Sequence, residues 1–274
     1  MVLYMKIYQN NELSSEQYHG DREYISSSGL KLLLTSPKEF HDRYVLNLES
    51  GTKSSPALIQ GCHLHSSILE PEKVDVEYSV FPGSIKRGKD WEKFLIENDN
   101  KVILTQAQAA LTDRLVKNFN TAEVVINKGG FTEPVKIASF YAGGVAEESV
   151  MGELDGVKVK VRFDYRKNFE TFGSINDLKT TSEYINSLDK VKEICEKMHY
   201  DLSASLYIDM AEKAFGVPHD FYFTFLSKAD GTVKIFRASK EFLEKGRLKY
   251  KRALELLKSA RKTGLYFTQD IEEV

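Results

Sequence analysis

Two runs of alternating apolar and polar residues meet at Asp155-Gly156, and this feature limits the possible folds most. The run VMGEL precedes the pair and the run VKVKVRFDYR follows it. An Asp-Gly pair between alternating runs is typical of a tight β-hairpin, because both residues tolerate the positive φ angles of such a turn. In the second run, the odd-numbered residues from Val157 to Phe163 would face one side and the even-numbered residues from Lys158 to Asp164 the other. The sequence therefore predicts an antiparallel strand pair with one apolar face.

The elements after this hairpin indicate a mixed sheet. A third strand, FGSINDLKTT, would place Ile175, Asp177 and Lys179 on one face. One long helix is expected next, with an apolar stripe formed by Leu188, Val191, Cys195, Met198 and Leu202. The runs DFYFTFLS and TVKIFRAS flank a second Asp-Gly pair, at Asp230, and a last helix is predicted from about Ser239 to Thr263. This order predicts an α/β (α+β) fold with a mixed central β-sheet flanked by helices.

The first 125 residues or so have mainly helical patterns. One helix should begin within residues 26–28, and the segment SPKE at residues 36–39 has the form of a capping box that opens another. Pro56 opens a third helix that ends before Pro71, and a fourth follows Thr105. We expect a single domain over residues 1–274, with a helical N-terminal part to about residue 125 and the sheet in residues 126–274.

Composition excludes several classes of protein. The chain has 38 basic and 40 acidic residues among 274, so its net charge of −2 does not indicate nucleic-acid binding and any such surface must be local. Its two cysteines, Cys62 and Cys195, lack the spacing of a thiolate metal cage or a disulfide scaffold. No run is long enough to span a membrane, and the first residues do not resemble a signal peptide, so we expect a cytoplasmic protein.

The residues with the clearest chemical potential are Asp164, Asp177 and Lys179. Asp177 and Lys179 stand two apart on one strand and project from the same face, and Asp164 on the neighbouring strand can converge on them. Carboxylates suit a hard cation such as Mg²⁺, and a nearby lysine can orient a water molecule or stabilise charge on a phosphate. Glu147 or Glu148 on the first strand could add a carboxylate. The alternative is a solvated strand face with a surface ion pair, since such short patterns recur by chance.

Two further features permit both a functional and a structural interpretation. Gly61 stands one helical turn before His65, which leaves room for a ligand beside the imidazole, while His63 points away. The structural alternative is a packed histidine beside a glycine that permits close helix contact. The last helix carries eight basic residues against one acidic residue between Lys245 and Lys262, a pattern that suits a phosphate backbone or an ordinary solvated face.

Taken in order, these segments resemble the RecE-type (exodeoxyribonuclease VIII-like) exonucleases of phages and prophages, within the PD-(D/E)XK nuclease superfamily. The resemblance covers residues 24–225 approximately and rests on five ordered motifs. They are ISSSGLKLLLTSPKEF, the G-x-x-x-H helix ending in LEP, RGKDW, the pair E-x-S and R-x-D at residues 147–149 and 162–164, and DLKTT at residues 177–181.

The resemblance implies a PD-(D/E)XK core and a set of site residues. Its metal ligands would be Asp164, Asp177, His65, Glu147 and the carbonyl of Leu178, and Lys179 would position or activate the attacking water. The expected cofactor is Mg²⁺ or Mn²⁺. Candidates for contact with the substrate are Arg162, Thr180, Ser203 and Tyr207. Ser203 stands where the family usually has glutamine, a departure that bears on end preference more than on hydrolysis.

By the same resemblance, the expected activity is 5′-to-3′ degradation of linear double-stranded DNA, which leaves 3′ single strands for recombination. The expected partners are double-stranded DNA ends, further copies of the chain in a trimeric or tetrameric ring, and a single-strand annealing protein. Two alternatives stay open. One is a Cas4-like or repair nuclease of the same superfamily, although those commonly carry four cysteines, and the other is a non-catalytic DNA-binding phage protein.

Overall fold

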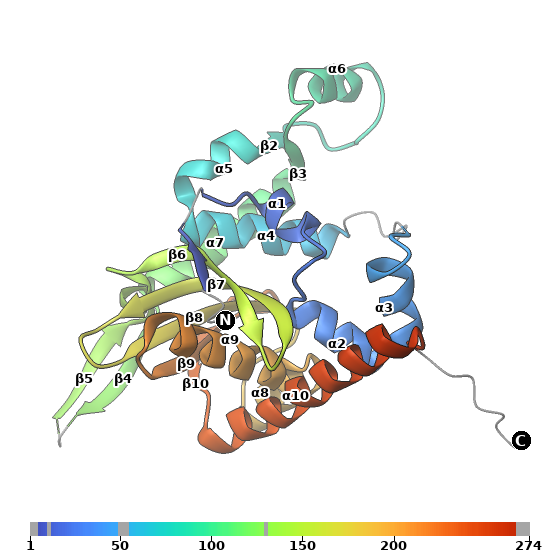
Figure 1. Ribbon diagram of the computed structural model, residues 1–274. Helices are drawn as coiled ribbons and strands as arrows, with labels where there is room; N and C mark the ends of the chain where they lie inside the picture. The colour runs from blue at the N-terminus through green and yellow to red at the C-terminus, as the bar shows by residue number, and fades with distance from the viewer. Residues whose placement is uncertain (1–4, 10–11, 49–54, 129–130, 267–274) are drawn as a thin grey trace, which may run out of the picture.

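A six-stranded mixed sheet forms the centre of the computed structural model, which describes residues 5–9, 12–48, 55–128 and 131–266. In spatial order the strands are β1 (Lys6–Tyr8), β6 (Val145–Leu154), β7 (Val157–Asn168), β8 (Gly173–Thr181), β9 (His219–Ser227) and β10 (Val233–Arg237). Neighbours run antiparallel except β8 and β9, which are parallel. The expected mixed α/β architecture is confirmed (Figure 1).

The two Asp-Gly pairs form turns as predicted. Asp155 and Gly156 have φ angles of 49° and 78°, and Leu154 pairs directly with Val157, so the turn has two residues. Gly231, with a φ angle of 82°, lies in the second turn, between the antiparallel strands β9 and β10. Local turn chemistry therefore sets the positions of both hairpins.

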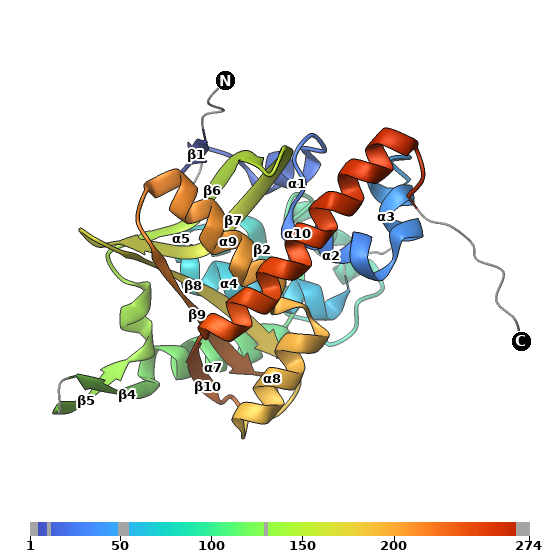
Figure 2. The same ribbon diagram turned by 60° about the horizontal axis from the view of Figure 1, so that its bottom comes forward.

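Helices cover one face of the sheet and enclose the larger core. These helices are α2 (Ser27–Thr35), α8 (Leu188–Lys197), α9 (Tyr200–Phe215) and α10 (Lys240–Thr263). Figure 2 shows α9 and α10 lying in front of the sheet. The odd-numbered residues Val157 to Phe163 of β7 point into this core, as predicted from the alternation. Gly246 brings α10 close to α9, because a Cβ there would lie 1.9 Å from the carbonyl oxygen of Asp201.

A smaller core lies on the other face of the sheet. Helices α4 (Pro56–Leu69) and α7 (Gln106–Thr121) and the 3₁₀ turn η1 (Ile137–Tyr141) supply it with Leu64, Leu115, Phe119 and Ile137, which pack on Leu178 and Leu226 of the sheet. The Pro56 and Thr105 helix starts are confirmed. Leu178 packs into this core while its neighbours Asp177 and Lys179 point to the opposite face, so β8 has the predicted alternation.

The remaining elements lie at the periphery. They are α1 (Ser15–Gly20), α3 (Pro37–Tyr44), α5 (Pro71–Glu77), α6 (Lys89–Glu97), the parallel pair β2 (Tyr78–Phe81) and β3 (Val102–Thr105), and the hairpin β4 (Glu123–Lys128) and β5 (Phe131–Lys136). Figure 1 shows α6 at the end of the molecule away from the sheet. The RGKDW motif leads into this helix, where the Trp91 ring packs 4.9 Å from the Phe81 ring.

Two sequence-based predictions of helices are wrong. The single helix expected over residues 188–202 is two helices, because His199 has a φ angle of 48° and turns the chain between α8 and α9. Leu188 and Met198 of the expected apolar stripe are 56% and 49% exposed, so the stripe is not continuous in the core. Helix α3 begins at Pro37 as predicted, but the Ser36 side chain makes no capping hydrogen bond.

The mainly helical N-terminal part also contributes to the sheet. Strand β1 forms its edge and pairs with β6, and Ile25 forms a bridge with Val159 of β7. Residues from both parts of the chain therefore build the central sheet. Within the described residues, no helix is both long and apolar enough to cross a membrane.

Candidate metal-dependent active site

Strands β7 and β8 separate at the two predicted aspartates. Their antiparallel ladder runs from Asn168–Gly173 to Tyr165–Asn176, so Asp164 and Asp177 would form the next pair. They do not pair. Instead, Oδ2 of Asp164 accepts a hydrogen bond of 2.7 Å from the backbone N–H of Leu178. Because the N–H and C=O of one strand residue point to the same side, the Leu178 carbonyl also faces the gap between β7 and β8.

The ladder between β6 and β7 is interrupted at the same level. Ala146 pairs with Tyr165 and Glu148 with Phe163, but the opposed residues Glu147 and Asp164 form no ladder pair. Glu147 has a φ angle of 52°, in the left-handed region that residues other than glycine adopt only at some cost in free energy. With the backbone in this conformation, the Glu147 carboxylate lies beside that of Asp164.

The structure distinguishes between the two candidate glutamates. Glu148 is 2% exposed and forms an ion pair with Arg166, whose Nη2 lies 3.1 Å from Oε1 of Glu148. Its carboxylate is therefore engaged in a structural pair. Glu147, in contrast, lies with His65 and Asp164, as the E-x-S motif predicted.

His65 approaches Asp164 from helix α4. Its Nδ1 lies 3.8 Å from Oδ2 of Asp164. His63 points the other way, is 5% exposed, and lies with Nδ1 2.9 Å from the Thr112 hydroxyl. A Cβ placed on Gly61 would meet only Thr180 Oγ1, at 3.8 Å, which confirms that this glycine leaves space beside His65.

His65, Glu147 and Asp164 form a group that fits a divalent cation. One potential ligand atom from each lies within 4.8 Å of the other two. Burial, together with the nearby carboxylates of Asp164 and Glu70, raises the pKa of Glu147 from 4.5 to about 8. A bound cation would relieve this repulsion between carboxylates. Carboxylate oxygens are the ligands that Mg²⁺ and Mn²⁺ prefer, and an imidazole nitrogen is a common ligand of transition-metal cations.

Asp177 and Lys179 form a buried ion pair next to this group. Lys179 Nζ lies 2.5 Å from Oδ2 of Asp177, and the Asp177 side chain is only 5% exposed. Burial raises the pKa of Asp177 to about 6 although Lys179 opposes the shift. Burial alone would lower the pKa of Lys179, but Asp177 and Asp164 outweigh it and raise it, so the ammonium stays charged. The carboxylate of Asp177 lies outside the three-residue group formed by His65, Glu147 and Asp164.

Tyr200 contacts the ammonium of Lys179 on the side of α9. The Lys179 Nζ lies 5.3 Å from the centre of the Tyr200 ring, and Nζ of Lys31 lies 5.2 Å from the same ring. Such contacts are favourable because the face of an aromatic ring carries partial negative charge. Sequence reasoning assigned no role to Tyr200, since a tyrosine on an apolar helix stripe is usually a packing residue.

A groove of about 1040 Å³ opens over the three-residue group, and we call it the Asp164 groove. His65, Glu147, Asp164, Thr180 and Tyr207 are among the residues that line it, together with residues from α1, α2, α4 and α5. Ser203 is 8% exposed on α9 and is not among the lining residues in the described chain. The predicted substrate contacts Thr180 and Tyr207 thus border the groove, whereas Ser203 is buried and does not.

Arg162 also lines the groove, but its donors hold the N-terminal segment in place. Its guanidinium donates to Oγ of Ser149 at 2.8 Å and to the carbonyl of Leu13 at 2.9 Å, and lies 4.3 Å from the centre of the Tyr18 ring. Arg162 therefore fixes the wall of the groove formed by α1. Sequence analysis missed this wall, because nothing local in residues 13–21 indicates contact with a strand that is far away in the chain.

Half of the basic residues predicted on the last helix are paired with neighbouring carboxylates. Four of its eight basic residues form ion pairs with carboxylates: Lys245 with Glu196, Arg247 with Asp209 and Glu244, Lys249 with Asp201, and Lys258 with Glu255. This arrangement favours the structural interpretation of the pattern over a surface reserved for DNA.

Comparisons with known proteins agree with this geometry. A family model described as "PDDEXK-like domain of unknown function (DUF3799)" matches residues 26–266. A solved structure from Eubacterium rectale, described as a "Putative exonuclease", matches with a TM-score of 0.62 at 17% identity, over 95% of this chain and 96% of that chain. A second, SSO0001, reaches a TM-score of only 0.34 at 10% identity, over 86% of this chain and 77% of its own, too low to indicate a shared fold. A search of curated proteins found no match. At 17% identity, the first likeness shows the fold alone.

Proposed function

The chain belongs to the family of PDDEXK-like domains whose model matches residues 26–266, and from this premise we propose that it is a metal-dependent deoxyribonuclease. More specifically, we propose a 5′-to-3′ exonuclease that degrades linear double-stranded DNA and leaves 3′ single strands. The observation that carries the proposal is the convergence of His65, Glu147 and Asp164, from three separate segments, beside the Asp177–Lys179 pair.

The contacts indicate a role for each residue of the site. His65, Glu147 and Asp164 would hold Mg²⁺ or Mn²⁺, with Asp177 and the Leu178 carbonyl as the further ligands that the resemblance to RecE-type nucleases implies. Such a cation supplies positive charge that stabilises the transition state of phosphodiester hydrolysis. The hydrogen bond from Leu178 to Asp164 orients this carboxylate before any ligand arrives.

Lys179 would act as a cation beside the reacting phosphate. Because Asp177 and Asp164 raise the pKa of Lys179, its side chain holds its proton and can donate hydrogen bonds to the attacking water or to a phosphate oxygen. It would thus position the water rather than take its proton. Tyr207 and Thr180 border the groove where the DNA strand would lie, and Arg162 holds the segment that leads into α1 at its wall.

The partners of this activity are part of the proposal. We propose that the protein acts in the cytoplasm on double-stranded DNA ends, as a trimeric or tetrameric ring that encloses the duplex, and that a single-strand annealing protein takes up the product. Light scattering with and without DNA tests the ring, because a monomer at micromolar concentration in both conditions would exclude it.

Incubation of the protein with three DNA substrates tests the nuclease. The substrates are a linear 5′-phosphorylated duplex, a covalently closed circle and a single strand, each with Mg²⁺, Mn²⁺ or EDTA. The variants are Asp164→Asn and Asp177→Ala, with Asp189→Asn as the matched control, because the Asp189 side chain is 94% exposed on α8.

We expect loss of the linear duplex only, abolished by EDTA and by both active-site substitutions and unaffected by Asp189→Asn. Cleavage of the circle at a similar rate would instead indicate an endonuclease related to the Cas4-like or repair enzymes. Binding without cleavage in either metal would indicate a non-catalytic DNA-binding protein.

A further inference from the structure

The RGKDW motif has no part in the proposed chemistry, and it lies in an exposed basic loop. Residues 82–89 connect β2 to the first turn of α6 and are all exposed, and we call them the Arg87 loop. The loop contains Lys86, Arg87 and Lys89 and no acidic residue. With the next turn of α6, residues 82–93 have four basic and two acidic residues, a net charge of +2 against −2 for the whole chain. The Arg87 loop is therefore a local positive surface on a slightly acidic protein.

The Arg87 loop lies beyond one boundary of the Asp164 groove. Tyr78 and Val102, the first residues of β2 and β3, line the groove. Strand β2 ends three residues later at Phe81, so the loop begins about 10 Å from the groove. Figure 1 shows β2 and β3 leading from the body of the molecule to α6. At about 3.4 Å per base pair, this distance corresponds to roughly three base pairs of duplex DNA.

Packing within and around the motif holds the loop against α6 and β3. The ring centres of Phe81 and Trp91 are 4.9 Å apart, and those of Phe81 and Phe94 are 5.2 Å apart. Lys86 donates a hydrogen bond of 3.3 Å to the carbonyl of Ile103 on β3, and its Nζ lies 5.5 Å from the centre of the Trp91 ring. A surface that is held in this way loses little conformational freedom when it binds a partner.

The side chains of Arg87 and Lys89 have their donors available for a ligand. Within the described residues, neither side chain forms an ion pair or a hydrogen bond. A guanidinium has five N–H donors and an ammonium has three, and both groups bind phosphate oxygens. The loop therefore offers two adjacent cations that the protein itself does not neutralise.

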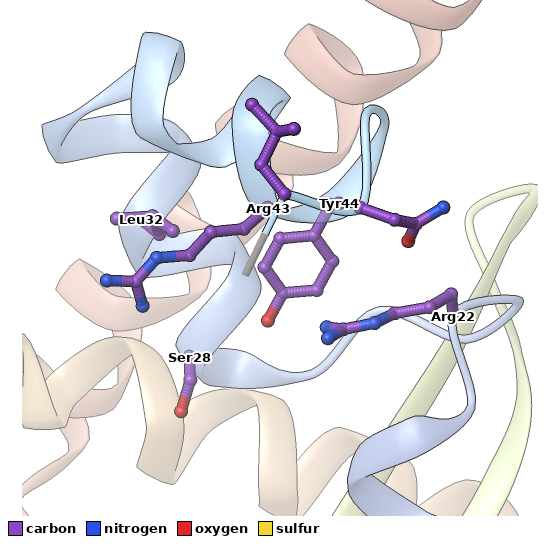
Figure 3. Close-up of a pocket in the computed structure, with 7 residues that line it drawn as sticks. Arg22, Ser28, Leu32, Arg43 and Tyr44 are labelled. Atoms are coloured by element: carbon purple, nitrogen blue, oxygen red, sulfur yellow. The ribbon is translucent and has the colours of Figure 1, made fainter. Parts of the chain in front are cut away.

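Two arginines beside the Asp164 groove differ in this respect. Arg22 and Arg43 line a smaller cavity of about 510 Å³ and lie on either side of the Tyr44 ring (Figure 3). Arg22 lies 5.0 Å from the centre of that ring, and Arg43 forms an ion pair with Glu39. Contacts within the protein therefore engage both of these guanidinium groups, in contrast to the free cations of the Arg87 loop.

The composition of the loop favours a phosphate backbone over unpaired bases as its ligand. Proteins that bind single strands present exposed aromatic rings on which the bases stack. Residues 82–89 contain no aromatic residue, and the nearby Trp91 and Phe81 rings pack against each other. Exposed basic side chains without a stacking surface suit the regularly spaced phosphates of a duplex, which are bound independently of sequence.

We propose that the Arg87 loop contacts the phosphate backbone of the duplex, about three or more base pairs from the strand end that is cut. This inference rests on the proposed nuclease function and identifies a surface that holds the substrate outside the Asp164 groove. Arg87 and Lys89 each contact a phosphate, and Lys86 keeps the loop in position. The loop thus adds affinity for duplex DNA without touching the phosphate that is cut.

The test measures DNA affinity with Ca²⁺ in place of Mg²⁺, so that binding is measured apart from cleavage. Fluorescence anisotropy compares the wild type with Arg87→Gln, Lys89→Gln and the double variant. Arg252→Gln is the matched control, because Arg252 is exposed on α10, on the face of the sheet opposite α4 and α7. Thermal unfolding verifies that each variant is folded.

Four DNA probes locate the contact. They are a blunt duplex, the single strand of the same length, and two duplexes that carry a patch of uncharged methylphosphonates. In one of these duplexes the patch is at the end that is cut, and in the other it begins at about the fourth base pair, where the Arg87 loop would reach.

We expect the double variant to bind the duplex about tenfold more weakly and to reduce the slope of log Kd against log salt concentration by roughly 1.8, since two phosphate contacts are lost. Its affinity for the single strand should not change. In the wild type, the distal methylphosphonate patch should reproduce the loss. In the double variant, the same patch should have little further effect, because the contact is already absent.

The inference is overturned if the folded double variant binds the duplex as the wild type and Arg252→Gln do, or if it loses as much affinity for the single strand as for the duplex. Equal weakening of the wild type and the double variant by the distal patch also overturns it. Cleavage of the linear duplex by the wild type with Mg²⁺ separates these results from failure of the nuclease proposal. An active wild type with unaffected loop variants excludes only the loop contact, whereas a wild type that neither binds nor cuts DNA refutes both proposals.

Discussion

The neighbours Glu147 and Glu148 should respond in opposite ways to the same substitution by glutamine. Both lie on β6, but Glu147 belongs to the candidate metal group and Glu148 to a buried ion pair. We expect Glu148→Gln to destabilise the protein and leave the chemistry intact. We expect Glu147→Gln to abolish cleavage without destabilising the fold.

The cost of Glu148→Gln follows from the burial of its partner. The Arg166 and Glu148 side chains are 7% and 2% exposed, so removal of the carboxylate charge leaves a guanidinium without its counterion in the interior. Breaking such a pair typically costs about 3–5 kcal/mol. Glutamine keeps one acceptor oxygen for Arg166, so we expect a loss of about 3 kcal/mol in the free energy of unfolding.

The change in the free energy of unfolding has the opposite sign for Glu147→Gln. The reason is that the pKa of Glu147 is about 8 in the folded protein, against 4.5 for an ordinary glutamate. Between these two values the unfolded chain has lost the proton that the folded chain retains, so stability falls as pH rises from about 4.5 to about 8. Glutamine removes this penalty. In EDTA we expect Glu147→Gln to be more stable than the wild type by up to about 4 kcal/mol at pH 8 and equal to it near pH 4.5.

Urea unfolding in EDTA at pH 5.5 and pH 8, monitored by circular dichroism, measures both effects, and cleavage of linear DNA with Mg²⁺ measures activity. Folded Glu148→Gln should cut at close to the wild-type rate per molecule. The reasoning is refuted if Glu147→Gln loses as much stability as Glu148→Gln, or if it retains cleavage.

Three further predictions concern the same region. In calorimetry, the affinity for Mn²⁺ should rise between pH 6 and pH 8, because Glu147 must release its proton to bind a cation, and a Kd independent of pH would contradict this. Tyr200→Leu should slow single-turnover cleavage about tenfold, because the Lys179 ammonium loses its contact with an aromatic ring. Tyr200→Phe keeps the ring and should cleave at close to the wild-type rate. Equal rates for the two variants would exclude a role for this contact. Gly246→Ala should lower the free energy of unfolding by about 2 kcal/mol or more, because its Cβ would overlap the carbonyl oxygen of Asp201 and separate α9 from α10. An unchanged midpoint in urea unfolding would disprove this packing argument.

Most helices and strands were predictable because their signals are local. The Asp155-Gly156 turn, the proline that opens α4 and the alternation along β7 each act within a few residues, and the structure has all three. The G-x-x-x-H spacing likewise predicted open space next to His65, because residues four apart lie on one face of a helix and Gly61 has no side chain to fill it. The failure at His199 has the opposite cause. The apolar spacing continues across residues 188–202, but the chain turns there so that α9 can pack on the sheet.

The sequence by itself determined which residues could take part in chemistry and on which element each lies. It could not determine that β7 and β8 separate between Asp164 and Asp177, or that Glu147 adopts a left-handed backbone conformation opposite Asp164. Strand register and ladder breaks depend on pairing between segments distant in the chain, so a local pattern contains no information about them. The strand pattern allowed either glutamate and only the E-x-S motif favoured Glu147; the tertiary structure gives the physical reason that Glu147 joins His65 and Asp164, because Arg166 holds the Glu148 carboxylate in the core.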